Sequence, residues 1–336
     1  MNYKVRFGYF QPLEKIHPSY ALDLAVTAER LGFEMIATAD HFHPWWDTNA
    51  YCGFAWSWLS VVLDRTSKVL CGTCVTAPIL RYHPAIIAQA WATMYEMFPR
   101  RVFLGLGTGE AINEVPLGFE WPTPIERVER LEEAVKIIKL LWTSENPVTF
   151  NGKYYKLRHA KLYPCPSGEP LLLIAAGGMK TADIAGKYAD GIITVPEHFK
   201  PELFERFENS AKKSGRDPTK LSRHLDISCS YDEDYDKALE AVKPKAGVLL
   251  PLVFKYAIYN PIEIESYAKL ISDDAIKSSW IIFTDYEEPI KIFEKYIKLG
   301  FTHFHIESQS PDEKKFLIFF GQKVLPYLKE TYGDSS

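Results

Sequence analysis

Residues 35–46, Met-Ile-Ala-Thr-Ala-Asp-His-Phe-His-Pro-Trp-Trp, change abruptly from apolar to polar and aromatic chemistry. The run 35–37 is typical of a buried strand, and an acid, two imidazoles, a proline and two indoles follow it closely. Such groups are costly to bury, and a plain connection between two elements does not need them. We therefore interpret this stretch as a strand whose end forms the floor and one wall of an active site.

Working outward from this stretch, an apolar run followed by an amphipathic helical segment recurs along the chain. Continuously apolar runs indicate parallel strands that are covered by helices, because both faces of such strands are buried. Eight repeats predict a closed α/β fold, the (β/α)8 TIM barrel, in one domain over residues 1–336. We expect insertions at 110–124, at 146–163 (a hairpin around Asn151-Gly152) and at 244–285, and strands at 5–10, 35–37, 69–76, 102–107, 171–176, 191–195, 225–230 and 303–306.

Composition and charge exclude several classes of protein. The chain has 336 residues, 47% of them hydrophobic and 24% charged, which suits a large globular core. Its net charge of −4 argues against broad nucleic-acid binding, which needs a basic face. The sequence has no apolar run long enough for a membrane span, and strand-like residues begin within the first seven positions. We therefore expect a cytoplasmic protein without membrane or nucleic-acid partners.

Active sites of such barrels lie at the carboxyl ends of the strands. Polar, glycine-rich or aromatic residues follow most of the predicted strands, so they should converge on one rim. In chain order they are Glu14; Asp40, His41 and Trp45; Thr76 and Pro78; Thr108, Gly109, Glu110 and Asn113; Gly177 and Gly178; Glu197 and His198.

Each candidate also has a simpler interpretation. His41 can exchange a proton with a substrate hydroxyl, or it can be a structural histidine in a loop. His41-Phe42-His43 could hold a metal in a barrel metallohydrolase, but the rim offers too few further ligands, so we expect no metal. Cys71 and Cys74 are expected to be inert core residues, since no second cysteine pair follows them.

Two glycine-rich stretches suggest ligand contacts. Residues 105–110, Gly-Leu-Gly-Thr-Gly-Glu, lack the spacing of a dinucleotide fingerprint, and their glycines are better suited to letting the backbone approach a flat ligand. Gly177-Gly178 precedes a predicted helix, whose first N–H groups favour a phosphate. The alternative is an ordinary strand–helix connection.

The motifs in combination resemble a known family, the coenzyme F420-dependent dehydrogenases of the bacterial-luciferase-like superfamily. The resemblance extends from about Gly8 to the last helix. It rests on Asp-His-Phe-x-Pro-Trp at 40–45, Gly-Thr-x-Val at 72–75, Arg-Tyr-x-Pro-Ala-x-x-Ala-Gln at 81–89, Gly-Thr-Gly-Glu-Ala-x-Asn-Glu at 107–114 and Ala-Ala-Gly-Gly at 175–178.

This resemblance implies an enzyme that transfers a hydride from an alcohol to C5 of coenzyme F420. It assigns His41 as the base, Glu110 to the ring nitrogen that gains a proton, and Trp45 and Glu14 to the substrate pocket. Phe42 and Trp46 are then left to packing, and the 74–75 peptide is expected to form a bulge, often cis. The implied cofactor-binding residues are Asp40, Cys74, Val75, Ala77, Thr108, Asn113, Gly177, Gly178, Lys180 and Thr181.

The substrate is where this chain departs from the sugar-phosphate members of the family. Those members hold phosphate with two lysines, an arginine and a threonine, whereas the matching positions here keep one lysine. Loss of the arginine removes a bidentate phosphate contact. We therefore expect a small secondary alcohol as substrate, with a sugar 6-phosphate as the alternative, and a homodimer as in most of the family. The residues concerned are Lys255, His198, Ser279 and Val195.

Overall fold

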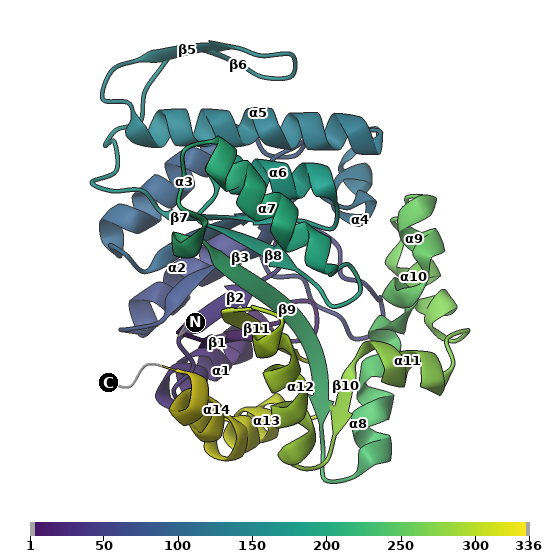
Figure 1. Cartoon of the computed structure of the whole chain (residues 1–336). Helices are drawn as coiled ribbons and strands as arrows, with labels where there is room; N and C mark the ends of the chain where they lie inside the picture. Colours follow the sequence, from purple (N-terminus) through teal and green to yellow (C-terminus); the bar gives the residue numbers. More distant parts are fainter. Residues whose placement is uncertain (1–3, 334–336) are drawn as a thin grey trace.

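Eight parallel strands form a closed barrel in the computed structural model, which describes residues 4–333 (Figure 1). Neighbouring strands of the ring are hydrogen-bonded to one another, and β8 pairs with β9 to close it. The predicted barrel is therefore confirmed, and all eight expected strands belong to it. Around the ring they are β9 (Ser222–Tyr231), β11 (His303–Ser308), β1 (Arg6–Phe10), β2 (Met35–Thr38), β3 (Leu70–Thr76), β4 (Val102–Leu106), β7 (Leu171–Ala175) and β8 (Gly191–Thr194).

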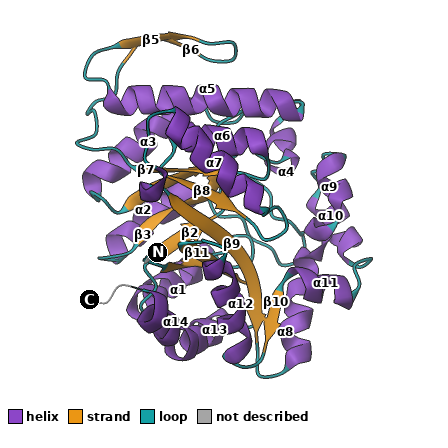
Figure 2. Cartoon of the chain, in the orientation of Figure 1, coloured by secondary structure: helices purple, strands orange, loops and turns teal. Residues whose placement is uncertain are grey.

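Helices surround the barrel (Figure 2). Several begin with a proline in the first turn, where the missing N–H is not needed for the helix. A short π-helical segment, Phe320–Val324, joins the last two helices. The covering helices are α1 (Pro18–Arg30), α2 (Ala55–Arg65), α3 (Pro84–Met97), α5 (Pro124–Thr143), α6 (Met179–Tyr188), α7 (Pro201–Lys213), α8 (Tyr235–Val242), α12 (Glu287–Lys298), α13 (Glu313–Phe319) and α14 (Leu325–Tyr332).

The three expected insertions all interrupt the strand–helix alternation. The first contains α4 (Ala111–Glu114) and a 3-10 turn (Val115–Leu117), and the second is the expected antiparallel hairpin of β5 (Val148–Asn151) and β6 (Lys156–Ala160). The third contains η3 (Lys243–Leu249), α9 (Pro251–Lys255), α10 (Pro261–Ala268) and α11 (Asp273–Ser279). It ends in β10 (Ile281–Phe283), which adds to the carboxyl end of β9 outside the ring.

The barrel interior has an apolar half and a polar half. Side chains of β1, β2, β3, β4, β7 and β8 form one apolar cluster that includes Phe10, Phe103 and Ile193. On β9 and β11, by contrast, residues paired in register are polar at every second position. The ring of His305 lies 5.7 Å from that of Phe103, which places this polar face inside the barrel. The register pairs are His224 with His303, Asp226 with His305 and Ser228 with Glu307.

The cysteines and the helices of the described residues bear on two further expectations, that Cys71 and Cys74 are core residues and that the chain has no membrane span. Cys71 and Cys74 are free and buried, which agrees with their interpretation as core residues. Between residues 4 and 333, no helix combines the length and the apolar character that a membrane crossing requires.

Replacing Gly186 by alanine should destabilise the fold. A glycine-to-alanine change inside an exposed helix normally stabilises by about 1 kcal/mol. At Gly186 a Cβ atom would lie 2.2 Å from the main-chain oxygen of Phe207, where α6 packs against α7. We expect G186A to lower the free energy of unfolding by about 1–3 kcal/mol, measured by urea denaturation. Asn209→Ala, on the exposed face of α7, is the control; equal stability of both variants would contradict the tight packing.

Candidate active site

The carboxyl ends of three strands bring His41, Glu14 and Glu110 together. Nδ1 of His41 lies 3.3 Å from a carboxylate oxygen of Glu14, and Nε2 lies 3.1 Å from one of Glu110. The side chains of His41 and Glu14 are 9% and 7% exposed, whereas that of Glu110 is 36% exposed. Both imidazole nitrogens thus face a carboxylate, one fixed inside the protein and one at the accessible rim.

This geometry favours the protonated imidazole. Burial lowers the pKa of His41, but the carboxylates of Glu14 and Glu110 raise it by more, so the pKa lies above the ordinary histidine value. A histidine that holds its proton between two acids can become a base only after one of its partners moves. Glu110 is the accessible partner, so we expect that partner to be the one that moves.

Asp40 lies directly before His41 but does not reach the rim. Its carboxylate is fully buried and accepts hydrogen bonds from Trp56 Nε1 (2.9 Å), Thr76 Oγ1 (2.8 Å) and Tyr82 Oη (3.2 Å). Arg81 lies 3.3 Å from the other side of the same carboxylate. Asp40 therefore joins β2, β3 and α2 at the base of the site. A ligand contact from its carboxylate would require one of these partners to leave.

Arg81 links the loops that carry His41 and Glu110. Its guanidinium donates to the main-chain oxygen of Asp40 and to that of Asn113, and it lies 3.7 Å from Glu114. The side-chain oxygen of Asn113 in turn accepts from the N–H of Phe42 at 2.8 Å. Burial raises the pKa of Glu114 to about 7 although Arg81 opposes the shift.

The aromatic residues of the opening stretch divide differently from the expectation. Trp45 is buried, and its ring lies 5.3 Å from that of His41 and 5.7 Å from that of Phe254 on α9, so it forms a wall beside His41. Trp46 is buried, as expected for packing. The expectation of packing for Phe42 is wrong, because its side chain is 45% exposed and only stacks on its neighbour His43.

The residues expected to face a flat cofactor form a surface with little room for side chains. The peptide between Cys74 and Val75 is cis, and the register of β3 shifts in this region, as expected for a bulge. A Cβ atom on Gly107 would lie 2.6 Å from a methyl group of Val75. Gly109 has φ +72°, a conformation that glycine adopts without strain. Thr108 is partly exposed at this surface, whereas Ala77 is buried behind it.

The amino end of α6 is where the sequence predicts a phosphate site. No side chain caps this helix, so its first N–H groups are free to bind a ligand. A Cβ atom on Gly178 would meet nothing within 4 Å, so there is open space in front of the helix. Lys180 is exposed in the first turn, and the hydroxyl of Thr181 donates to the main-chain oxygen of Gly178 at 2.9 Å.

The four residues expected to select the substrate each contact a different neighbour in the protein. His198 lies against Gly177, where a Cβ atom would be 3.1 Å from its Nδ1. Lys255 is exposed over the ring of Tyr256, and the hydroxyl of Ser279 donates to Ala275 within its own helix at 2.9 Å. No hydrogen bond or ion pair joins these side chains to one another among residues 4–333, although the main-chain oxygen of Val195 accepts from the N–H of His198 at 3.1 Å.

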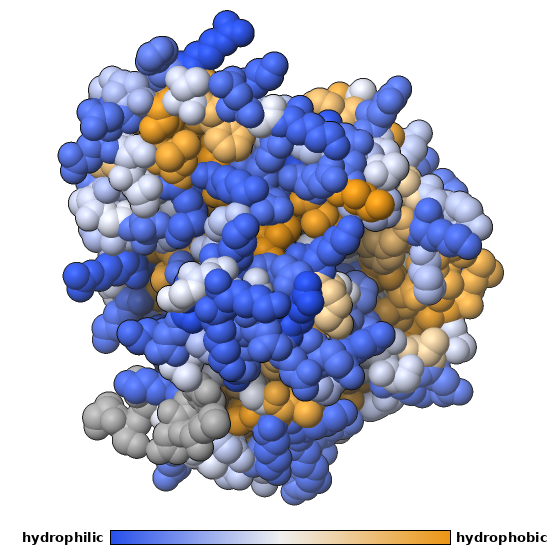
Figure 3. Space-filling view, turned by 45° about the horizontal axis from the view of Figure 1, so that its top comes forward, coloured by the Kyte–Doolittle hydropathy of each residue, from blue (hydrophilic) through white to orange (hydrophobic). Residues whose placement is uncertain are grey.

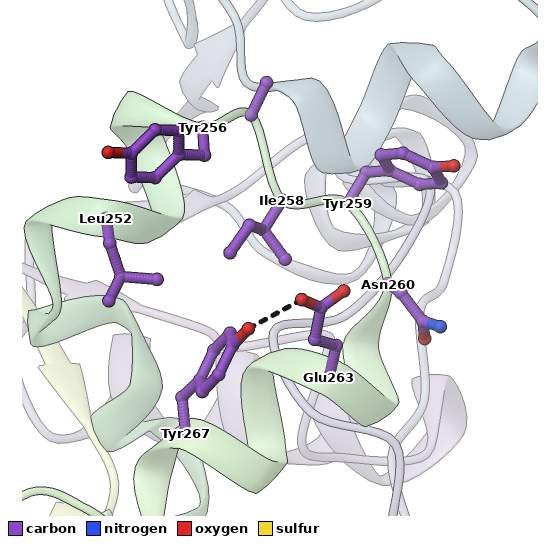
Figure 4. Close-up of a pocket in the computed structure, with 8 residues that line it drawn as sticks. Leu252, Tyr256, Ile258, Tyr259, Asn260, Glu263 and Tyr267 are labelled. Carbon is purple, nitrogen blue, oxygen red and sulfur yellow. Dashed lines mark hydrogen bonds between the residues drawn. The ribbon is translucent and has the colours of Figure 1, made fainter.

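A groove of about 520 Å³ lies away from this chemistry, between α9 and α10 (Figure 4). On the α10 side of the groove the hydroxyl of Tyr267 donates to Glu263, one turn earlier in the same helix, at 2.7 Å. None of its eight lining residues belongs to the predicted site. The surrounding insertion exposes Phe254, Ile262 and Leu270, and Figure 3 shows a hydrophobic surface on this side of the molecule.

Sequence reasoning missed three charged residues in the barrel mouth, namely Lys245, Asp226 and Glu307. The ammonium group of Lys245 contacts both carboxylate oxygens of Glu307, and their side chains are 13% and 9% exposed. Asp226 lies one register step away on β9. The signal was present, since polar residues alternate along two strands that were expected to be buried on both faces.

Known proteins resemble this chain over almost its whole length. Residues 5–303 match the family model described as luciferase-like monooxygenase. An F420-dependent glucose-6-phosphate dehydrogenase of Microbacterium testaceum is 36% identical, over 99% of this chain and all of the relative. An enzyme of the same name from Nakamurella multipartita is also 36% identical and covers 98% of both chains.

Among the solved structures that resemble this chain is an enzyme with a different kind of substrate from glucose 6-phosphate. An F420-dependent secondary alcohol dehydrogenase, in complex with an F420-acetone adduct, is 41% identical and superposes with a TM-score of 0.91. The match covers 96% of this chain and 98% of that chain. The F420-dependent tetrahydromethanopterin reductase of Methanopyrus kandleri, 23% identical with a TM-score of 0.80 over 96% of this chain and 99% of that chain, shares the fold.

Replacing Glu110 by glutamine should lower the pKa of His41 in the cofactor-free protein. Removing a charge 3.1 Å from Nε2 leaves burial opposed by Glu14 alone, so less base is needed to remove the proton. We expect the midpoint to fall by about 1 pH unit in an NMR titration of the histidine ring signals. The His41→Asn spectrum identifies the signal, and His83, whose pKa burial lowers, should titrate unchanged. An unshifted His41 midpoint would contradict the bracketing by two acids.

Proposed function

The chain belongs to the luciferase-like family, and we propose that it is an F420-dependent dehydrogenase that oxidises a small secondary alcohol. The observation that carries this proposal is the position of His41 between Glu14 and Glu110, beside the wall of Trp45. An acid–base group at a flat binding surface is what removal of a hydride from a carbinol carbon requires.

The residues present fit the cofactor. Gly107 and Gly109 pack without side chains against Val75 and Ala77, and a backbone without side chains can also lie close to a planar ring system. The uncapped amino end of α6, with Gly178 and Lys180, suits the phosphate of the cofactor's side arm. F420, when bound, supplies the carbon that accepts the hydride. In this proposal Asp40 shapes the site from behind, because its carboxylate is occupied by protein donors.

In this proposal Glu110 leaves Nε2 of His41 and takes its proton as a neutral carboxylic acid, and the neutral imidazole then accepts the proton of the substrate hydroxyl. Nδ1 stays against Glu14, whose carboxylate stabilises the imidazolium that forms, and Nε2 faces the side that Glu110 can leave. Such an acid–base contact typically accelerates a reaction by about 10²–10⁴-fold. Glu110, partly exposed and also held by the side-chain amide of Asn113 at 3.3 Å, then acts toward the cofactor side.

The substrate side favours an uncharged alcohol over a sugar 6-phosphate. A phosphate needs several cationic or N–H donors in one place. Lys255, His198 and Ser279 point to different neighbours, and Val195 has no donor. The two F420-dependent glucose-6-phosphate dehydrogenases, each 36% identical, support glucose 6-phosphate as the alternative substrate. The F420-dependent secondary alcohol dehydrogenase, 41% identical, supports the alcohol.

A cytoplasmic homodimer completes the proposal. Helices α2 and α3 expose the apolar side chains of Val61, Ile86 and Met97, which are 44%, 53% and 61% accessible. Exposed apolar groups on neighbouring helices suit a subunit interface. Light scattering of the purified protein measures the mass directly.

Mixing the purified protein with F420 and 2-propanol should abolish the visible absorbance of F420. Under the same conditions glucose 6-phosphate should react at least tenfold more slowly, because Lys255 is the one residue kept from the set that holds phosphate in the sugar-phosphate members. The measurement is the initial rate of absorbance loss over a range of each substrate. Faster reaction with glucose 6-phosphate would replace the alcohol by the sugar phosphate, and tight binding of FMN without any use of F420 would overturn the proposal.

Replacing His41 by asparagine should reduce kcat by about 10²–10⁴-fold, because the proton acceptor is lost while the ring-binding surface remains. His43→Asn is the matched control: it removes an imidazole two residues away that stacks only on Phe42. Binding of F420, followed by its fluorescence, should be retained in both variants. Similar rates for the two variants would remove His41 from the reaction.

A further inference from the structure

The mouth of the barrel contains a set of charged groups that the proposed reaction does not use. Lys245 on η3 contacts Glu307 at the end of β11, and Ser228 donates to the same carboxylate at 2.5 Å. The amide of Gln309 donates to Glu307 at 2.9 Å. Asp226 lies two residues before Ser228 on β9, on the same face of the strand and deeper in the barrel. These groups therefore form a continuous polar wall. We call this set the β9–β11 wall.

The β9–β11 wall lies next to the predicted base. Glu307 is the register partner of Phe10 at the end of β1, and the loop that follows β1 carries Glu14, whose carboxylate lies against Nδ1 of His41. A substrate positioned for proton transfer to His41 therefore has this wall on one side. The opposite side of the barrel mouth is apolar, with Phe10, Ala39 and Cys74 in one cluster.

Some hydrogen-bonding capacity in this region is unused by the protein. One carboxylate oxygen of Glu14, a residue only 5% exposed, has no protein partner, and neither has one oxygen of Asp226. Asp226 keeps part of its surface accessible. Burial and the neighbouring Glu307 raise the pKa of Asp226 far above its ordinary value, which favours a carboxyl that can donate as well as accept.

Stability does not account for this arrangement. A buried ion pair is usually no more stabilising than apolar side chains of similar volume, because desolvation offsets the attraction between the charges. The apolar half of the same barrel interior is built from such side chains. If the pocket had to hold only a hydrocarbon group of the substrate, apolar side chains on β9 and β11 would be the simplest way to complete it.

We propose that the β9–β11 wall is a substrate subsite that binds a second oxygen, a hydroxyl or carbonyl next to the carbinol carbon of a neutral alcohol. Lys245 donates to that oxygen, and Asp226 and the free oxygen of Glu14 complete its hydrogen bonds. The preferred substrate is then a diol or hydroxyketone. This inference rests on the proposed function and specifies its substrate class.

The ligand is uncharged because the wall already balances its own cation. Glu307 neutralises Lys245 at direct contact, and Glu14 adds a further negative charge nearby. A carboxylate or phosphate at the same place would face more acids than bases. A hydroxyl group meets both donors and acceptors there and leaves none of them unpaired.

The test compares 2-propanol with each enantiomer of 1,2-propanediol, which has the same secondary carbinol and one more hydroxyl. We expect kcat/KM for one enantiomer of the diol to exceed that for 2-propanol by about tenfold or more, since a site built around a hydroxyl discriminates against an analogue without it. The double variant K245M/E307L removes the pair without leaving a buried charge alone. It should lose most of this preference.

Lys243→Met is the matched control, because Lys243 lies on the same η3 segment but pairs with Glu240 and Asp273 at the surface. It should keep the preference for the diol. Equal use of both alcohols by the native protein, or an unchanged preference in the double variant, would overturn the subsite. In either case the alcohol dehydrogenase assignment itself would stand.

Ligand-detected NMR on the protein with F420 separates the two proposals. Suppose that the native protein shows saturation transfer to the diol and that K245M/E307L does not. This result supports the subsite even when no alcohol reduces F420, and in that case the proposed function alone fails. Absence of transfer to both 2-propanol and the diol overturns the subsite. If K245M/E307L and Lys243→Met retain equal saturation transfer to the diol, the β9–β11 wall has a structural role only and the subsite is overturned.

Discussion

The buried carboxylate of Asp40 is the interaction on which the geometry of the site depends. It accepts from an indole, a hydroxyl and a phenol on separate parts of the chain, and Arg81 compensates its charge. Breaking such a buried charge pair typically costs about 3–5 kcal/mol, so the arrangement is stiff. Because His41 is the next residue, its ring position follows from the way Asp40 is held. Arg81 extends the same constraint to the loop of Glu110 through Asn113.

The site places reactive groups on a graded scale of accessibility. Asp40 is enclosed, Glu14 and His41 are nearly enclosed, and Glu110 is open at the rim. The enclosed groups fix geometry, whereas the open one is free to respond to a ligand. This order also explains why the two acids around one imidazole can have different tasks. They contact different nitrogens, and only one of them can move without disturbing the barrel.

Much of this architecture was predictable from sequence because it depends on local pattern. Continuously apolar runs locate all eight strands, and residues that directly follow a strand reach the rim, as His41 and Glu110 do. The role of Asp40 was not predictable, since its partners Trp56, Thr76 and Tyr82 come from other elements. Lys245 was missed for the same reason. It lies on an irregular insertion, and only the three-dimensional fold brings it to Glu307, 62 residues away.

The scattering of Lys255, His198 and Ser279 has a related cause. Sequence matching aligns positions, but the direction of a side chain depends on the local helix or loop that carries it. Ser279 turns its hydroxyl back into its own helix, and the insertion around α9 places Lys255 on its outer surface. Substrate selection is therefore the part of the function that sequence determines least directly.

The close packing of the glycines on β3 and β4 has a consequence for how such a protein can change over evolutionary time. A Cβ atom on Gly105 would lie 2.1 Å from the main-chain oxygen of Thr73, and one on Gly72 would lie equally close to that of Phe103. Mutational drift at these positions is blocked by backbone atoms, which cannot turn aside as a side chain can. The insertion at 244–285 is attached outside the ring, and although Gly247 is blocked in the same way by the main-chain oxygen of Ile264, its exposed residues such as Lys255 have no such restriction. New specificities can accordingly arise at the rim while the chemistry beneath it is inherited unchanged.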